Sequence, residues 1–342
     1  MSTPFLNDTL YRAVRRNVYC LREGNQTSFR PHYLSRVTQI DWDKYQWTQL
    51  DSRARLGAIA LGKFYLYFAH HKGKSIRLAY ADQVEGPWTI HTPGALNLTD
   101  SLFPDVDPPE PPPHKRPIWA DTLPGGYLYA HIASPDVHID ERQQQIWMYY
   151  HGLLENGDQQ TRVAHSSDGL CFTPETPLLG PPYFRVFQFQ KWWYAITWRG
   201  RFLRANHWKG PFETQQDPGP AMVLFGSDSK LELRHPTACL RGDTLHLFFS
   251  CLGDRPEKIY HCAGNVSGDW NAWQFSKPEI VLTPEKDWEG ADLPVTTSII
   301  GAADTRLREL RDPGIFIDSK DTYLLYSGAG EANIGIARLE DF

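Results

Sequence analysis

The chain of 342 residues carries 35 Lys and Arg against 40 Asp and Glu, a formal net charge of −5. Aromatic residues make up 13% of it, which excludes a disordered or collagen-like chain because so much aromatic surface can fill a sizeable core. The acidic balance and the lack of a long basic run argue against nucleic acid as a partner. No apolar stretch approaches the roughly 18 residues of a membrane-spanning helix, so no membrane partner is expected.

The chain starts with an expected extension of about residues 1–35, in which residues 8–16 favour a short helix. Its arginines at positions 12, 15 and 16 precede no apolar stretch, so we expect no signal peptide. The five cysteines are an odd number without a C-x-x-C pair, which favours free thiols in a reducing compartment. We therefore expect a cytoplasmic protein.

Five later segments resemble one another. Each begins with a polar turn, continues as an aromatic-rich strand of alternating apolar and polar residues, and adds a second alternating strand after a short connection. Such alternation predicts β-strands. The segments are residues 62–89, 144–173, 190–213, 242–270 and 320–339.

A further apolar strand with a polar head precedes four of these repeats, and residues 51–60 are expected to supply the fifth. Three or four antiparallel strands, repeated five times, predict an all-β, five-bladed β-propeller as a single domain of residues 1–342. A two-sheet sandwich would not explain five similar units. The last blade would borrow a strand near residues 17–21, and the Pro-rich residues 104–117 are expected to form an extended loop. The four strands are residues 131–139, 181–189, 233–240 and 310–317.

Three of these strand heads place an ionisable residue beside proline. The innermost strands of a propeller converge on its central channel, and proline restricts the backbone on either side of it. We therefore expect Asp136, His235 and Asp312 to meet in one funnel. The alternative is that each merely caps a turn at the start of a strand. The three motifs are Ser134-Pro135-Asp136, Arg234-His235-Pro236 and Arg311-Asp312-Pro313.

With these motifs the chain resembles the propeller glycosidases: arabinanases and β-xylosidases of glycoside hydrolase family 43, the invertase group and neoagarobiose hydrolases. Arg311-Asp312-Pro313 is similar to the Arg-Asp-Pro motif of the invertase group, in which the aspartate holds sugar hydroxyls. The resemblance implies hydrolysis of a short oligosaccharide. It also implies a general-acid glutamate on the third blade, but residues 183–187 contain no carboxylate. The chain also resembles the neoagarobiose hydrolases, which implies a histidine as the general acid. His235 can fill that role or be a structural histidine.

The remaining candidates lie near strand ends. Glu289, in the long connection before the fifth inner strand, is a second candidate acid or else an ordinary solvated carboxylate. Asp51 is the nearest candidate for a first-blade base. The 13 histidines form no compact metal box, so no cofactor is expected, although the resemblance allows a structural cation in the channel. The expected catalytic set is Asp136, Asp312, His235 and Glu289, and the expected substrate-binding set is His71, His131, His151, Tyr183, Arg185, Arg234 and Arg311.

Two hypotheses remain open at this point. In the first the protein is a glycoside hydrolase, which needs two reacting groups facing each other across a pocket. In the second it is a non-catalytic propeller that binds a saccharide or a protein, which needs only stacking aromatics and hydrogen-bond donors. The sequence leaves the sugar, the linkage, the stereochemical outcome and the oligomeric state open.

Overall fold

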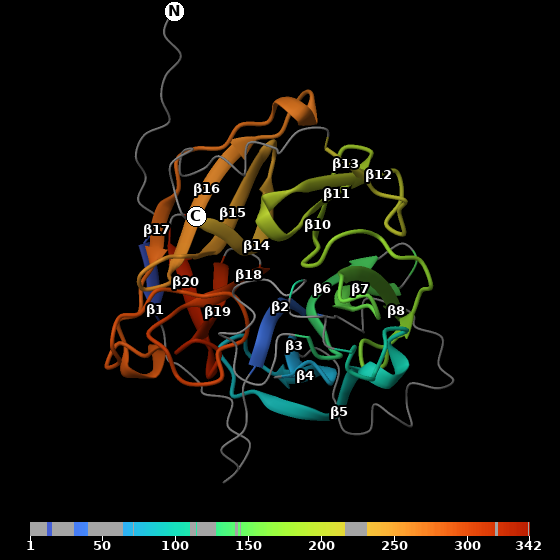
Figure 1. Ribbon diagram of the computed structural model, residues 1–342. Helices are drawn as coiled ribbons and strands as arrows, with labels where there is room; N and C mark the ends of the chain where they lie inside the picture. The colour runs from blue at the N-terminus through green and yellow to red at the C-terminus, as the bar shows by residue number, and fades with distance from the viewer. Residues whose placement is uncertain are drawn as a thin grey trace, which may run out of the picture.

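The computed structural model contains five four-stranded antiparallel sheets in the described part of the chain, arranged in a ring (Figure 1). This confirms the five-bladed β-propeller. No helix among the described residues is long and apolar enough to cross a bilayer. The structure describes residues 12–15, 31–39, 64–70, 72–109, 114, 128–140, 143, 145–215, 231–318, 321–340 and 342.

Each blade is a run of neighbouring antiparallel strands, and four of the five follow chain order. The first blade contains β2 (Pro31–Gln39), β3 (Phe64–His70), β4 (Ser75–Ala81) and β5 (Thr89–Asn97). The second contains β6 (Ile132–Asp140), β7 (Gln145–Leu153), β8 (Gln159–Ser166) and β9 (Thr173–Pro174). The third contains β10 (Arg185–Phe189), β11 (Trp192–Ile196), β12 (Phe202–Ala205) and β13 (Glu213–Thr214). The fourth contains β14 (Glu232–Arg241), β15 (Thr244–Leu252), β16 (Ile259–Asn265) and β17 (Glu279–Leu282).

The fifth blade is closed by a strand from the N-terminal part of the chain. It contains β18 (Arg311–Asp318), β19 (Asp321–Gly328), β20 (Asn333–Glu340) and then β1 (Arg12–Arg15), which pairs antiparallel with β20. The borrowed strand was expected, but at residues 17–21, which lie outside the described residues. The helix expected at 8–16 is wrong over β1, because pairing with the open edge of β20 outweighs a local helix preference.

The inner strand of the first blade is also placed differently from the expectation. It is β2, which pairs with β3, and not a strand within residues 51–60, which lie outside the described residues. In the other four blades the first two strands are joined by a few residues, whereas residues 40–63 separate β2 from β3. The expectation failed because it assumed the same short connection in every blade. Of the Pro-rich loop, only residues 104–109 and 114 are described.

The heavy aromatic load fills the space within and between neighbouring blades. Trp147 of β7 stacks on Trp208 at 3.9 Å between ring centroids, and the ring of Phe187 lies 5.4 Å from that of Tyr194. Large aromatic rings pack well between the apolar faces of sheets and bury much surface. Most of the aromatic composition is therefore accounted for by the core. The four cysteines described, Cys171, Cys239, Cys251 and Cys262, form no disulfide bond with one another.

Candidate functional site

The heads of the inner strands share one backbone distortion. The pairing register of the second, fourth and fifth blades breaks at the head, and the residue within the break has a positive φ: 52° at Ser134, 47° at His235 and 52° at Asp312. Tyr183, just before β10 in the third blade, has a φ of 67°. Non-glycine residues in this region of φ are uncommon and cluster at functional sites. These four residues therefore occupy one equivalent position in four blades.

This register corrects the expected equivalence of Asp136 with His235 and Asp312. Proline follows His235 and Asp312 but precedes Asp136, so Ser134 holds their position and Asp136 lies two residues further along. Its Oδ2 accepts hydrogen bonds from His138 Nε2 at 2.8 Å and from the backbone N–H of Val186 at 2.7 Å. Asp136 thus joins the second blade to the third and does not belong to the cavity lining described next.

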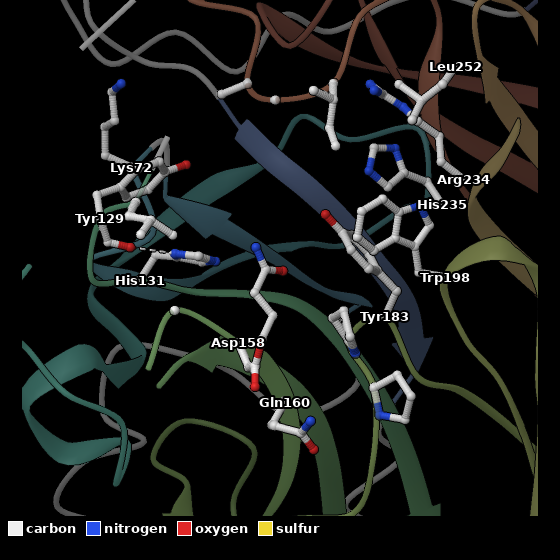
Figure 2. A pocket seen from close by; sticks show the side chains of 18 of the residues that line it. Lys72, Tyr129, His131, Asp158, Gln160, Tyr183, Trp198, Arg234, His235 and Leu252 are labelled. Atoms are coloured by element: carbon white, nitrogen blue, oxygen red, sulfur yellow. Dashed lines mark hydrogen bonds between the residues drawn. The ribbon is translucent and has the colours of Figure 1, made fainter. Parts of the chain in front are cut away.

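A cavity of about 410 Å³ opens between the strand heads (Figure 2). Its volume is within the range of roughly 300–1,000 Å³ that is typical of small-molecule sites. The wall comes from segments of the first four blades and from the connection that leads to the fifth, so residues far apart in sequence meet there. Its polar and aromatic lining consists of Lys72, Tyr129, His131, Asp158, Gln159, Gln160, Tyr183, Trp198, Arg234, His235 and Asp304.

His235 is a buried histidine of the cavity lining, and the carboxylate of Asp312 lies behind its ring. Its Nδ1 lies 2.6 Å from Oδ1 of Asp312, within the distance of a charge-assisted hydrogen bond, and both side chains are almost fully buried. Burial lowers the pKa of His235 below 6.5, although Asp312 acts in the opposite direction. Burial alone would raise the pKa of Asp312, but the neighbouring His235 outweighs it and holds that carboxyl below its usual range. The pair therefore holds an ionised aspartate beside an imidazole whose proton is easily lost.

Aromatic rings surround this pair. The ring of Tyr183 lies 5.1 Å from the ring of His235, 4.5 Å from that of His151 and 6.2 Å from that of Trp198. Trp198 belongs to the short helix η6 (Trp198–Gly200) and lies beside Tyr183 and His235 in the cavity wall (Figure 2). Ring faces of this kind stack on the apolar faces of sugar rings. His151 is buried behind Tyr183 and is not part of the lining.

The opposite wall carries charged and hydrogen-bonding groups. Figure 2 shows Lys72, Tyr129 and His131 across the cavity from Tyr183, Trp198 and His235. Lys72 Nζ lies 3.4 Å from Asp304 Oδ1 and 5.3 Å from the ring centre of Tyr129, which places Asp304 on this side too. The Nδ1 of His131 donates to the carbonyl of Tyr129 at 2.7 Å. His131 was expected to bind substrate, and it lines the cavity.

The two arginines of the strand heads differ in their environment. Arg234 lines the cavity, and its Nε lies 3.0 Å from Oε1 of Glu257. Arg311 is enclosed away from the lining by Glu309, Glu331 and Glu257, with its Nη1 3.0 Å from Glu331 Oε1. Burial opposes its charge, but the glutamates outweigh burial and raise the pKa of Arg311. Arg311 is therefore buried inside the fold, and the direct contact with substrate that was expected of it is not possible from this position.

Arg185, another expected site residue, has internal partners. Arg185 is buried and donates to the carbonyls of Ser134 at 3.1 Å and Phe184 at 3.0 Å. Burial lowers the pKa of Arg185, and the charges of Asp136 and Asp312 on either side oppose that effect. Arg185 therefore neutralises charge between the second and fifth blades behind the cavity wall.

Glu289 has a structural place that neither sequence interpretation anticipated. It ends the short helix η9 (Asp287–Glu289) and is fully buried, not solvated. Its Oε2 accepts from the backbone N–H groups of Glu285 at 2.8 Å and Lys286 at 3.0 Å, and its Oε1 accepts from the Tyr326 hydroxyl at 2.7 Å. These contacts are those of a capping residue, and Glu289 is absent from the cavity lining. His71 and Asp51 lie outside the described residues.

Sequence reasoning missed several residues of the lining. Tyr129, Asp158, Trp198 and Asp304 lie in connections between strands, where no period or motif distinguishes them. The one signal available in the sequence was how close each residue lies to a strand end, because the connections at one face of a propeller converge on its central channel. No three His, Cys, Asp or Glu side chains within the described ranges form a metal-binding group.

The fold defines the class of protein: a five-bladed propeller like those of glycoside hydrolase family 43. A family 43 β-xylosidase/α-arabinofuranosidase from a compost metagenome, in complex with xylotriose, superimposes with a TM-score of 0.55 at 12% identity over 95% of this chain and 94% of that one. A thermostable family 43 enzyme gives 0.55 at 10% over 94% and 91%, and a Xanthomonas citri enzyme complexed with xylose gives 0.53 at 11% over 93% and 89%. At these identities the likeness concerns the fold alone.

A comparison of sequences identifies the family. The chain is 31% identical over 295 residues to the uncharacterized protein R118 of Acanthamoeba polyphaga mimivirus, which covers 82% of this chain and 78% of the viral one. The chain belongs to the family of that viral protein. No family model matches the sequence.

Proposed function

We propose that the protein hydrolyses a glycosidic bond of a short oligosaccharide in the cavity, with His235 as general acid. The observation that carries the proposal is the pairing of His235, a cavity-lining imidazole, with the buried carboxylate of Asp312 at 2.6 Å. A carboxylate at one ring nitrogen fixes the orientation of an imidazole and stabilises its protonated form. The other ring nitrogen, Nε2, is then the one that exchanges a proton with substrate.

The lining suits a sugar. Tyr183, Trp198 and Tyr129 offer ring faces, while Gln159 and Gln160 offer amides that pair with hydroxyl groups. The volume of about 410 Å³ fits a ligand of one to a few sugar rings. Enzymes of the same fold hold xylose and xylotriose, which supports a saccharide ligand here.

In the proposed reaction, His235 Nε2 gives its proton to the glycosidic oxygen as the bond from that oxygen to the anomeric carbon breaks. A water molecule adds to the anomeric carbon and gives a proton to a carboxylate on the opposite side. Asp304 is the carboxylate we assign to this step, because its contact with Lys72 places it across the cavity from His235. Proton exchange with solvent then restores both groups.

The test is a screen of the purified protein against aryl glycosides and against oligosaccharides from plant and marine polysaccharides. His235→Gln should lower turnover of any substrate found by about 10²- to 10⁴-fold, the usual contribution of acid–base catalysis. Asp158→Asn, at the exposed rim of the same cavity, is the matched control and should change turnover far less. Full activity in His235→Gln would contradict the proposal.

A second candidate function is saccharide binding without hydrolysis. It is favoured by the internal hydrogen bonds of Asp136 and Glu289, two carboxylates that the hydrolase hypothesis expected in the cavity. Calorimetric binding of a saccharide that is recovered intact after prolonged incubation would establish this function in place of the first.

A further inference from the structure

One wall of the cavity is a segment of chain, residues 298–304, that side chains beneath it hold in place. Ile300, Gly301 and Asp304 of this segment line the cavity. The Ser298 hydroxyl donates to Glu257 Oε2 at 2.5 Å. The two arginines next to the catalytic pair donate to the backbone of the wall, Arg234 to the carbonyl of residue 299 at 3.1 Å and Arg311 to the carbonyl of Gly301 at 3.3 Å. The wall is therefore tied to the strands that carry His235 and Asp312.

Glu257 is the centre of these ties. It lies in the connection between β15 and β16 and is fully buried. Its Oε1 lies 3.0 Å from Arg234 Nε, and its Oε2 lies 3.1 Å from Arg311 Nε. A buried carboxylate between two guanidinium groups holds both, and moving Arg234 away from it would separate a buried charge from its counter-ion.

We propose that Glu257 is a positioning residue, which couples the cavity wall of residues 298–304 to the His235–Asp312 pair. Its two carboxylate oxygens hold Arg234 and Arg311. Each arginine donates to the wall and directly precedes one residue of the pair in the sequence, Arg234 before His235 and Arg311 before Asp312. The inference deepens the proposed function and rests on it for the role of His235. The coupling itself concerns the folded chain without substrate.

The charges that face His235 give the direction of the electrostatic effect. They are Asp312 from β18, Arg234 from its own strand, and Glu257 from the β15–β16 connection, while Tyr183 covers its ring. Glu257 and Asp312 favour the protonated imidazole, and Arg234 disfavours it. Removal of the Glu257 charge leaves Arg234 uncompensated, so the pKa of His235 should fall further.

The experiment measures two properties of the full chain, neither of which needs a substrate. Hydrogen exchange followed by mass spectrometry reports opening of residues 298–304, and an NMR titration of the His235 ring reports its pKa. In Glu257→Gln we expect at least tenfold faster exchange in that segment together with a lower His235 pKa. In Ser298→Ala, which removes the hydroxyl tie and keeps every charge, we expect faster exchange and an unchanged pKa.

Glu289→Gln is the matched control, since it also converts a buried glutamate to its amide, but one that binds Tyr326 and not the arginines. It should change neither property. Unchanged exchange in both Glu257→Gln and Ser298→Ala, or an unchanged His235 pKa in Glu257→Gln, would overturn the proposal. If Glu257→Gln does not fold, Glu257→Asp replaces it: the shorter side chain should speed exchange, and slow exchange there would likewise overturn the coupling. If these measurements overturn the coupling, the proposed hydrolysis by His235 is unaffected. If the activity screen overturns the hydrolysis, the coupling is unaffected.

Discussion

At the scale of single residues, the contact between His235 and Asp312 balances burial against charge. Burial favours the neutral imidazole, and the aspartate 2.6 Å away favours the protonated one. Because burial is the larger effect, the pKa of His235 lies below 6.5, and most molecules carry a neutral His235 at pH 7. An acid of this kind works best under mildly acidic conditions.

For the proposed hydrolysis we therefore predict that kcat/KM falls as pH rises through the pKa of His235, below 6.5. In Asp312→Asn the protonated imidazole loses its counter-ion, so this limb should move to lower pH and the maximal rate should drop by about 10²-fold or more. A pH–rate profile of both proteins on one substrate measures this. A rate that instead increases with pH over the same interval would make His235 a base.

Glu289 leads to a prediction about stability. Truncation in Glu289→Ala leaves the buried Tyr326 hydroxyl and the N–H groups of residues 285 and 286 without their acceptor. Unfolding in urea should show a loss of about 1–3 kcal/mol, the cost of buried unsatisfied polar groups. Specific activity of the folded variant should be close to that of the parent. A large loss of turnover at unchanged stability would return Glu289 to the list of candidate acids.

The cavity-lining residues that were predicted from the sequence lie at the heads of inner strands. His235, Asp312 and Tyr183 were expected near the channel because inner strands converge on it; His235 and Tyr183 line the cavity, and Asp312 lies beside His235. Asp136 was placed in the wrong register because the three motifs were matched by having an ionisable residue next to proline, whether before or after it. Aligned on proline, Ser134 falls beside His235 and Asp312. Asp304 and Trp198 reach the cavity only through the path of their connections, which no local pattern records.

At the scale of elements, the connection from η9 to β18 depends on one glycine. Gly290 has a φ of 84°, and a Cβ there would lie 2.3 Å from the carbonyl oxygen of Leu307. Gly290→Ala should therefore destabilise the fold by clearly more than the roughly 1 kcal/mol of an unfavourable φ alone. Gly242→Ala is the control, because Gly242 has a φ of 57° but open space around its Cβ position. Equal losses of unfolding free energy for the two variants would contradict the steric argument.

Strands were predicted well where alternation continued across a short turn, as in the second to fifth blades. The first blade shows the limit of that rule. Its inner strand β2 is identified only by its pairing with β3, from which residues 40–63 separate it in the sequence. Such long-range pairing is a property of the tertiary structure and leaves no local sequence pattern. The same holds for β1, whose four residues become a strand only against β20.

At the scale of the whole molecule, β1 covers an edge that would otherwise be open. Deletion of residues 1–16 removes β1 and exposes the backbone groups of β20. We expect a lower melting temperature and concentration-dependent association, measured by calorimetry and light scattering. Deletion of residues 1–11 is the control, because it keeps β1. A truncated chain that stays monomeric with an unchanged melting temperature would refute this role.

A buried histidine pair predicts acid sensitivity. His246 Nδ1 lies 3.0 Å from His261 Nε2, and burial lowers the pKa values to about 4 and about 3. Since the unfolded values are near 6.5, the unfolded state binds more protons, so this stability is present above pH 6.5 and is lost as pH falls toward 4. The melting temperature should therefore fall between pH 7 and pH 5.

His261→Gln removes one titrating group of that pair and should show a smaller decrease over the same interval. The other ionisable groups are common to both proteins, so they cancel in the comparison. An equal or larger decrease in His261→Gln would assign the acid sensitivity elsewhere. The cytoplasmic location expected from the sequence stays a prediction.

The pairing of β1 with β20 also sets an order of events during synthesis. A ribosome releases β1 long before β20, its partner strand, with Arg12 opposite Glu340. The blade that supplies Asp312 is completed by this pairing, and Asp312 itself lies at the opposite edge of that blade, on β18. Until β20 leaves the ribosome, β1 lacks its partner strand in the fifth blade. The fifth blade, which carries Asp312, therefore gains its fourth strand only after β20 has been synthesised.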